Sequence, residues 1–394
     1  MPTEDIEYLR SRGALQLPNL ALQKALLQAF VESIHPQLPF VNLHTLLSIV
    51  HNRRGQNGKI SLLLYQAIMF SGSTVVNIEH LRDGGYETRL AAQKALFQRT
   101  RQLYDLDYEL DPLVIIQSLL LMTLRSGNQG EEKDAWHWVS LAVSLAYAIS
   151  LNKIPPAAGQ MSPEFRLKKR LWWCCLVREQ LVALEINRPS HIRPNDWRTT
   201  TLTIDDFEFR HLPKKVTDFY SDCGMMKNPN LQHELATIFT AEAWLCTIIS
   251  RLTQASRVFK HASKPDISEL DSVNEELLDW AQSLPSCCYI RDVTPTGVGE
   301  DKLVIATRRS ILHMLYYATN CIVHRMRHMS SIASVDLKSS VRASTTSQLR
   351  VREAVLHITR IIDDLNRHGL ISSLPATERT IIYSAISMSM QVMD

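Results

Sequence analysis

The sequence predicts an all-α fold, and two observations carry this prediction. Apolar residues recur every three or four positions along most of the 394 residues, which is the period of a helix face. The chain shows no set of alternating apolar and polar residues of the kind that strands display, and no clear internal repeat. We therefore expect a large single-domain helical array with irregular connecting loops. Two helical lobes that meet near 200–230 are the alternative.

The helices of the first half can be placed by their caps and apolar spacing. Asn19 is a typical N-cap, and an apolar residue recurs every four positions behind it, at Leu22, Leu26, Phe30 and Ile34. Asp111 and Pro112 form a second start signal, an N-cap followed by proline at the first helical position. Apolar residues lie on every face between Trp136 and Leu151, which predicts a central helix.

The second half shows the same pattern. One helix is predicted by the spacing of Leu235, Ile238, Leu245, Ile249 and Leu252. Another is predicted by the 4-3-4-3 spacing of Val351, Val355, Ile358, Ile362 and Leu365, and Gly369 should end it. Breaks are expected at 51–59, 154–163, 188–197, 227–230 and 291–301.

The expected organisation has four parts. Residues 1–15 form an N-terminal segment, and residues 16–329 form the main domain. Residues 330–347 are about half Ser and Thr, so we expect a flexible insert there. Residues 348–394 should then supply C-terminal helices that pack on the main domain.

Composition and charge indicate a soluble intracellular protein without a membrane partner. The chain is 45% hydrophobic and 21% charged, which is ordinary for a globular protein, and its net charge of +3 does not by itself indicate a nucleic-acid surface. The start, MPTEDIEYLR, lacks the basic residues and apolar run of a targeting signal. The best apolar run, 113–124, is shorter than the roughly 20 residues that a membrane span requires.

Candidate metal ligands are few. The seven cysteines form no Cys-x-x-Cys pair and two of their pairs are adjacent, which is poor chelating geometry, so we expect buried free thiols. His324 and His328 lie one helical turn apart, but the residues between them are Arg-Met-Arg, without a glutamate base. We expect a solvated basic helix face there and no metal ion.

Acidic pairs and nucleotide motifs give no stronger signal for an enzyme. Asp205-Asp206 and Asp363-Asp364 are similar to the magnesium-binding aspartates of all-helical terpene synthases. Glu208 partly completes the first pair, which lies in an expected loop, whereas Asn and Arg follow the second pair. No Gly-x-Ser-x-Gly elbow, phosphate loop or dinucleotide fingerprint occurs. We therefore expect neither an enzyme nor a cofactor.

Residues 166–192, RLKKRLWWCCLVREQLVALEINRPSHI, should contain a long core helix. The opening RLKKR is expected to form exposed first turns, with contact to phosphate as the alternative. Apolar residues over 171–177 and 181–186 should pack inward. Trp172 and Trp173 project about 100° apart, so they can contact two different neighbours.

The charged residues of the same stretch need partners. Arg178 and Glu179 also project about 100° apart, and a charge in a core helix must be paired or reach solvent, so we expect a separate partner for each. Pro189 should stop the helix, and Arg188 should lie where it can meet the last helical carbonyls.

Several stretches together resemble one family. In residues 30–47 a Phe-rich helix runs into His-Pro-x-x-Pro, and 136–155 are similar to a central helix. Residues 168–208 run from Arg-x-Leu-Trp-Trp through Arg-Pro to a late Asp-Asp-Phe, and 277–285 and 312–325 are similar to later helices. In this order, the motifs resemble the fungal transcription factor regulatory domain, the middle homology region of binuclear zinc cluster regulators. YLRSRGAL and LTIDDFE favour its cutinase transcription factor 1 beta-like subgroup.

The resemblance implies a nuclear regulator of transcription, with a metabolic or secondary-metabolite gene set as its target and the cytoplasm as the alternative location. It also implies a protein partner or a homo- or heterodimer, and a small-molecule effector. A stand-alone helical ligand-binding or scaffold protein is the alternative function, and an all-α enzyme is a further alternative. The family-motif residues, for which we expect a structural role, are His35, Pro36, Pro39, Arg170, Leu171, Trp172, Trp173, Arg178, Glu179, Arg188, Pro189, Asp205, Asp206 and Phe207.

The sequence departs from the family pattern in three places. Glu179 and Gln180 stand where the family usually has Asp-Arg, and Glu185 stands where it usually has Gly. The family normally carries a six-cysteine zinc cluster ahead of the region that matches Met1, whereas the first cysteine here is Cys174. We therefore expect that this chain reaches DNA only indirectly, through a partner, or that an upstream exon encodes the zinc cluster.

Overall fold

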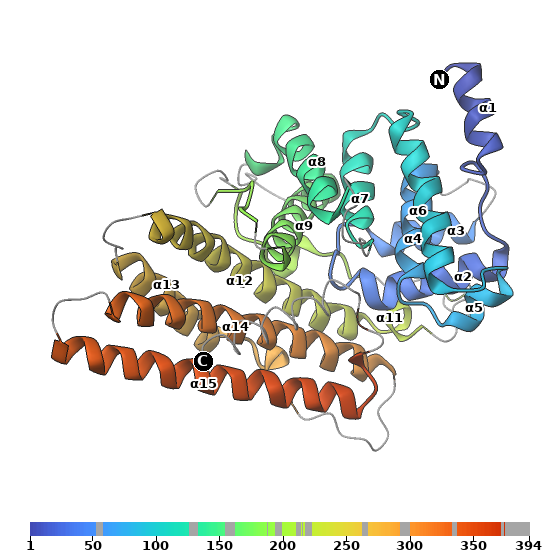
Figure 1. Ribbon diagram of the computed structural model, residues 1–394. Helices are drawn as coiled ribbons and strands as arrows, with labels where there is room; N and C mark the ends of the chain where they lie inside the picture. The colour runs from blue at the N-terminus through green and yellow to red at the C-terminus, as the bar shows by residue number, and fades with distance from the viewer. Residues whose placement is uncertain are drawn as a thin grey trace. The chain divides into compact units, whose positions relative to one another are not determined.

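The structure is a computed structural model that describes residues 1–52, 58–125, 133–153, 162–186, 188–193, 199–209, 214, 216, 223–261, 267–291, 300–332, 337–371 and 374. Every regular element among these residues is a helix, and the described chain contains no strand (Figure 1). The predicted all-α fold is confirmed. The chain divides into two compact units, and two of the three boundaries between them fall inside the helices α9 (Pro163–Glu185) and α12 (Pro229–His261).

The first unit comprises Met1–Arg178 and Arg198–Ala236. Besides the first part of α9 and the first turns of α12, it contains α1 (Thr3–Ser11), α2 (Leu20–Ala29), η1 (Phe30–Ile34), α3 (Leu43–His51), α4 (Leu62–Ser73), α5 (Ile78–Asp83), α6 (Arg89–Asp105), α7 (Pro112–Met122), α8 (Ala135–Ala148), η2 (Leu151–Lys153), η3 (Ile204–Asp206) and α11 (Gly224–Lys227).

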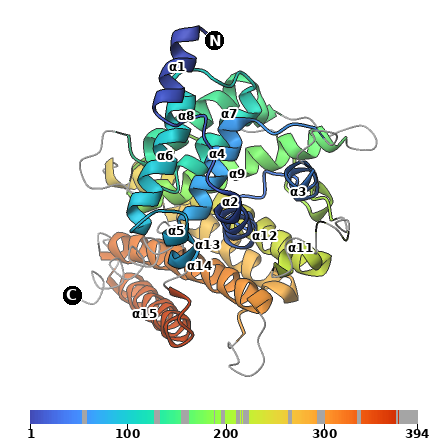
Figure 2. The same cartoon turned by 90° about the vertical axis from the view of Figure 1, so that its right-hand side faces the viewer.

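Helix α4 is the centre of this unit. All its residues from Leu63 to Ser73 are buried, and it packs against α2, α6 and α7 (Figure 2). The expectation that the helix over 136–151 is central is wrong. Helix α8 buries one face only, formed by Trp138, Val139, Ala142, Val143 and Ala146, because its remaining apolar residues lie near the surface.

Two helices of this unit begin at the residues that the sequence predicts. The Oδ1 atoms of Asn19 and Asp111 each accept a backbone hydrogen bond of 2.9 Å, which confirms both residues as N-caps.

Helices α2 and α4 approach so closely that a Cβ atom on Gly72 would lie 2.2 Å from the carbonyl oxygen of Leu26. Only glycine permits this contact.

The second unit comprises Glu179–Trp197 and Thr237–Asp394. It contains the end of α9, most of α12, α13 (Ile267–Ser283), η4 (Ser286–Cys288), α14 (Glu300–Ile332) and α15 (Leu337–Arg367). Helices α14 and α15 run side by side, and α13 packs on α14 (Figure 1). The predicted apolar face of the last helix is confirmed, since Val351, Ile358 and Leu365 are buried on it. Gly369 follows its end with a φ of +67°.

Helices α14 and α15 include most of the residues of the expected flexible insert over 330–347. Helix α14 extends to Ile332, and α15 begins at Leu337, so only 333–336 lie outside the described residues. Ser and Thr cost about 0.5 kcal/mol each in a helix relative to Ala, which packing along a neighbouring helix can offset. Of the C-terminal segment 348–394, the structure describes α15 and a few residues that follow it.

Among the described residues, one helix is long and apolar enough to cross a membrane, and it contains the helix predicted from Leu235 to Leu252. It is Pro229–Ala255 within α12, whose most apolar window has a mean hydropathy of 1.3. Because 72% of that window is buried inside the protein, the helix has the character of a core helix.

Candidate functional site

A cavity of about 450 Å³, partly open to solvent, lies within the first unit. The turn after η1, the start of α3, helix α9, the segment after η3 and the first turns of α12 form its walls. The lining includes residues from two motifs far apart in the sequence, namely His35, Pro36, Pro39, Arg170 and Phe207. The fold thus gathers five of the fourteen predicted residues at one place.

His35 lies in the turn after η1, which forms one wall of the cavity. Its Nε2 lies 3.0 Å from the carbonyl oxygen of Val41, and since a carbonyl only accepts, Nε2 carries the proton. Burial lowers the pKa of His35 to about 4, the bond to Val41 opposes this change, and the charge of Arg170 reinforces it. The ring is therefore neutral at physiological pH, and its Nδ1 atom is a hydrogen-bond acceptor.

Arg170 is the buried cation of the cavity. Arg170 is 4% exposed, and its guanidinium carbon lies 5.7 Å from the centre of the Phe207 ring. The Nε atom is buried, and no described residue accepts a hydrogen bond from it. Burial lowers the pKa of Arg170, and nearby acidic groups such as Glu208 oppose this change. An arginine nevertheless stays charged, so the cavity holds a cation whose Nε donor has no described acceptor.

Lys169, the neighbour of Arg170, has a partner of its own. Its Nζ lies 2.7 Å from Oδ2 of Asp206, and both side chains are almost fully buried. The same oxygen accepts hydrogen bonds from the backbone nitrogen of Thr203 at 2.7 Å and from its hydroxyl at 3.0 Å. The expectation that RLKKR forms exposed turns is therefore wrong for Lys169 and Arg170. The segment around η3 covers them and supplies the counter-ion.

Asn42 and Phe209 of the cavity were not singled out from the sequence, and Glu208 was considered only as a partner of the Asp205-Asp206 pair. Asn42 caps α3, since its Oδ1 accepts from Thr45, and its Nδ2 donates to the carboxylate of Glu208. Phe209 stacks on Phe207 with ring centres 6.2 Å apart and planes inclined by 9°. Asn42 carries an N-cap signal in the sequence. Glu208 and Phe209 carry none, because their positions depend on how the segment after η3 folds back.

The apolar motif residues of α9 serve packing. Leu171, Trp172 and Trp173 are all buried. The Trp172 ring lies edge-on against Tyr147 of α8 with ring centres 5.6 Å apart, whereas the indole nitrogen of Trp173 donates to the carbonyl oxygen of Thr200 at 3.2 Å. The two indoles thus contact different neighbours, as their angular separation predicts.

Arg178 has the separate partner that its position predicts. Its Nε donates to the hydroxyl of Thr123 at 2.6 Å, and its Nη2 donates to the carbonyl oxygen of the same residue at 2.9 Å. Thr123 is the C-cap of α7, where unpaired carbonyls and the helix dipole favour a positive charge. Arg178 therefore fixes the end of α7.

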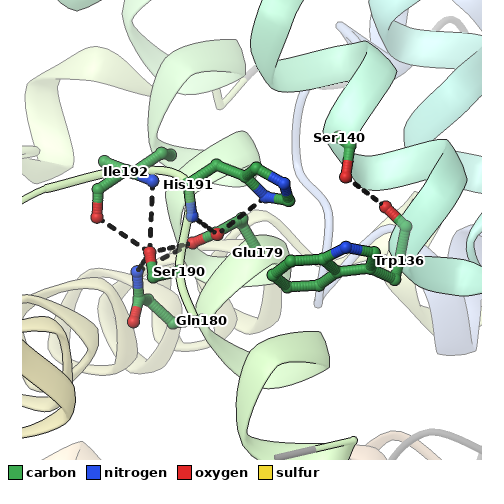
Figure 3. Close-up of polar contacts among 7 residues, drawn as sticks. All are labelled: Trp136, Ser140, Glu179, Gln180, Ser190, His191 and Ile192. Carbon is green, nitrogen blue, oxygen red and sulfur yellow. Dashed lines mark hydrogen bonds and ion pairs between the residues drawn. The ribbon is translucent and has the colours of Figure 1, made fainter. Parts of the chain in front are cut away.

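Glu179 organises a separate network in the second unit (Figure 3). Its fully buried carboxylate accepts hydrogen bonds from the Nε2 of Gln180 at 2.8 Å, from the hydroxyl of Ser190 at 2.6 Å and from the backbone nitrogen of His191. Gln180 Nε2 also lies 2.8 Å from the Ser190 hydroxyl. The amide at Gln180, where the family usually has Arg, is thus part of a network that ties the segment after α9 to the helix.

The end of α9 differs slightly from the expectation. The helix ends at Glu185, before Arg188 and Pro189, and both of these residues are exposed. The backbone nitrogen of Arg188 donates to the carbonyl oxygen of Ala183 at 3.1 Å. Arg188 thus meets one of the last helical carbonyls, as predicted, through a backbone bond.

The described residues contain no group of three or more His, Cys, Asp or Glu side chains that could hold a metal ion. Asp205 is exposed, whereas Asp206 is bound to Lys169, so this acidic pair does not converge on one point.

The expectation of a solvated face at His324 is wrong. This ring is buried, and burial followed by the charge of Arg327 lowers its pKa to about 4. The seven cysteines are free thiols, and all but Cys287 are buried.

The chemistry of the cavity is that of a binding site. It offers an unpaired cation, a neutral imidazole acceptor, polar side chains and aromatic surface. Its acid–base groups are engaged, because His35 holds its proton on the bond to Val41 and Glu208 accepts from Asn42. Such a mixture of apolar walls and a few directed polar groups is typical of small-molecule sites.

Comparisons with known proteins point in one direction. A family model described as "Fungal specific transcription factor domain" matches residues 27–330. The chain is 40% identical to "Cutinase transcription factor 1 beta" of Fusarium vanettenii over 97% of this chain and 46% of that protein. It is 29% identical to "Transcription factor cpaR" of Aspergillus oryzae, over 81% of this chain and 55% of the relative. It is 25% identical to an "Acetamidase regulatory protein" of Aspergillus fumigatus, over 82% of this chain and 37% of that relative. No solved structure matches.

Proposed function

Because the chain belongs to the family that carries the fungal specific transcription factor domain, we propose that it is a regulator of transcription. The match of the family model over residues 27–330 is the observation that carries this proposal. The family and the relatives are transcription factors, which are not enzymes. Their role implies a nuclear location for this chain.

The proposed regulator depends on a DNA-binding module outside these 394 residues. The chain spans less than half of the length of the cutinase transcription factor that it matches. Base-specific recognition requires side chains in a groove and cations on the phosphates, and the printed sequence shows neither a cysteine cluster nor a long basic stripe. The module would be supplied by a partner protein, such as a related full-length regulator, or by an upstream exon.

The cavity supports a second element of the proposal, a small-molecule effector. It gathers family-motif residues from two distant stretches, and a buried cation lines it without a bonded acceptor on its Nε among the described residues. We assign it the role of regulatory input. The alternative, a stand-alone ligand-binding protein, would use the same cavity without controlling transcription. A metabolic or secondary-metabolite gene set is the proposed target.

Deletion of the gene followed by transcript profiling separates these alternatives. A regulator changes the transcripts of a coherent gene set, and reintroduction of the gene restores them. A stand-alone binding protein would alter one metabolite and leave transcripts largely unchanged, and that result would refute the regulatory role.

A gel-shift assay with purified residues 1–394 tests the dependence on another module. We expect no specific, salt-tolerant band on promoter fragments of the affected genes when the protein is alone. A band should appear when the missing partner or upstream segment is supplied. A specific band with residues 1–394 alone would contradict the proposal. Mapping the 5′ end of the transcript then decides between a partner and an upstream exon.

A further inference from the structure

The unpaired cation of the cavity points to the class of ligand that the cavity takes. Arg170 is 4% exposed, and its buried Nε has no acceptor among the described residues. A guanidinium presents five donors in a planar fork that matches a carboxylate, and a buried charged donor without an acceptor is costly. We propose that the cavity binds a small organic carboxylate with Arg170 as its counter-ion. This inference rests on the proposed function in taking the cavity as the regulatory input.

The local balance of charge favours an anion. Lys169 and Asp206 neutralise each other at 2.7 Å and leave no charge for a ligand. Arg166 lies one turn before Arg170 on the same face of α9, and its charge acts on Arg170. Arg170 and Glu208 are the charged side chains of the described lining, and His35 is neutral. Glu208 accepts a hydrogen bond from Asn42, whereas the charge of Arg166 adds to that of Arg170 from the preceding turn, so the wall at Arg170 attracts an acid.

The lining also indicates that the acid has an apolar body. Phe207 and Phe209 are stacked, and Met225 and Leu235 line the same space. This apolar surface lies beside Arg170 in a cavity whose empty space of about 450 Å³ includes its mouth open to solvent. An inorganic anion would occupy only the part near Arg170. An aromatic or aliphatic acid would fill the rest and bury apolar surface on both sides.

Calorimetric titration of purified residues 1–394 tests the proposal with probes of known chemistry. Phenylacetate is the first probe, 2-phenylethanol is its neutral counterpart, and inorganic phosphate is an anion without an apolar body. Hydrogen bonds to a charged group are worth about 1.5–3 kcal/mol, which corresponds to about 10- to 150-fold in affinity. We expect saturable binding of phenylacetate, at least about tenfold tighter than that of either control.

Two variants and one matched control locate the binding. Arg170→Met should abolish phenylacetate binding while the free protein stays folded, because the substitution removes an unpaired buried charge. Lys168→Met, on the solvent side of the same basic run, should bind like wild type. Phe209→Ala should weaken phenylacetate and leave acetate unchanged. If Arg170→Met does not fold, Arg170→Lys keeps the charge, loses the fork and should bind at least about tenfold more weakly.

Several outcomes would overturn the inference. These are equal affinity for phenylacetate and 2-phenylethanol, equal affinity for phosphate, unchanged binding by Arg170→Met, and no saturable binding of acetate, hexanoate or phenylacetate. The regulatory role fails independently of the ligand. Binding with an unchanged transcript profile on gene deletion would refute the role alone, whereas a changed profile without binding would refute the ligand alone.

Discussion

Replacement of Lys169 by Met should destabilise the protein by about 3–5 kcal/mol, because it strands the Asp206 carboxylate in the interior. The two charges lie 2.7 Å apart, with side chains 2% and 0% exposed. At an effective dielectric constant of about 20, their attraction is about 6 kcal/mol, most of which offsets the desolvation of both ions. Without Lys169, Asp206 keeps only the donors of Thr203.

The assay is urea unfolding followed by tryptophan fluorescence, since Trp172 and Trp173 lie on the same helix. The single variant should unfold at a clearly lower urea concentration. The double variant Lys169→Met/Asp206→Asn removes both charges and keeps an acceptor for Thr203, so it should recover all but about 1 kcal/mol. Lys168→Met, whose partner Glu164 is exposed, should leave the midpoint unchanged. A loss below about 1 kcal/mol in the single variant, or no recovery in the double variant, would refute the reasoning.

Two further predictions follow from the first unit. The pKa of His35 falls from 6.5 to about 4 on folding, so the stability that its neutral form contributes is complete above pH 6.5 and is lost as the pH falls through 4. The loss of stability is about 3 kcal/mol. The difference in urea midpoint between wild type and His35→Gln should therefore shrink as the pH falls over this range. A difference that stays constant with pH would contradict this prediction. Gly72→Ala should cost about 1–3 kcal/mol, read as a lower melting temperature, because its Cβ would lie 2.2 Å from the carbonyl oxygen of Leu26. A melting temperature equal to that of wild type would show that the two helices separate freely.

The elements that the sequence predicts correctly are those set by local interactions. Asn19 and Asp111 cap their helices through bonds to residues two or three positions away, and the spacing on α15 defines its face. Helix α4 was not singled out from the sequence. Its polar end can be buried because the hydroxyls of Ser71 and Ser73 donate to carbonyls three residues earlier.

The candidate site was only half predictable. Motif resemblance singles out His35, Arg170 and Phe207, but nothing in the order of residues shows that they line one cavity. Burial of Lys169 and Arg170 depends on a segment more than thirty residues later that folds over α9. A basic run is usually solvated, and only a tertiary counter-ion reverses that expectation.

The charged residues of α9 show why Arg170 is the informative one. Three other residues with buried charges have a direct partner within the described structure: Lys169 pairs with Asp206, Arg178 donates to Thr123, and the Glu179 carboxylate accepts from Ser190 and Gln180. These three contacts hold α9 to a loop, to the end of α7 and to its own following segment. The half-buried Arg166, one turn before Arg170, also has a buried Nε without a described acceptor. Arg170 contacts the Phe207 ring, but its buried Nε has no hydrogen-bond acceptor among the described residues, and an unmet charged donor is costly even for a weakly hydrated guanidinium. Arg170 lies in a cavity wall, beside a neutral histidine and two stacked aromatic rings. On our proposal, the acceptor that Nε of Arg170 lacks among the described residues is supplied by the carboxylate of a ligand from solution.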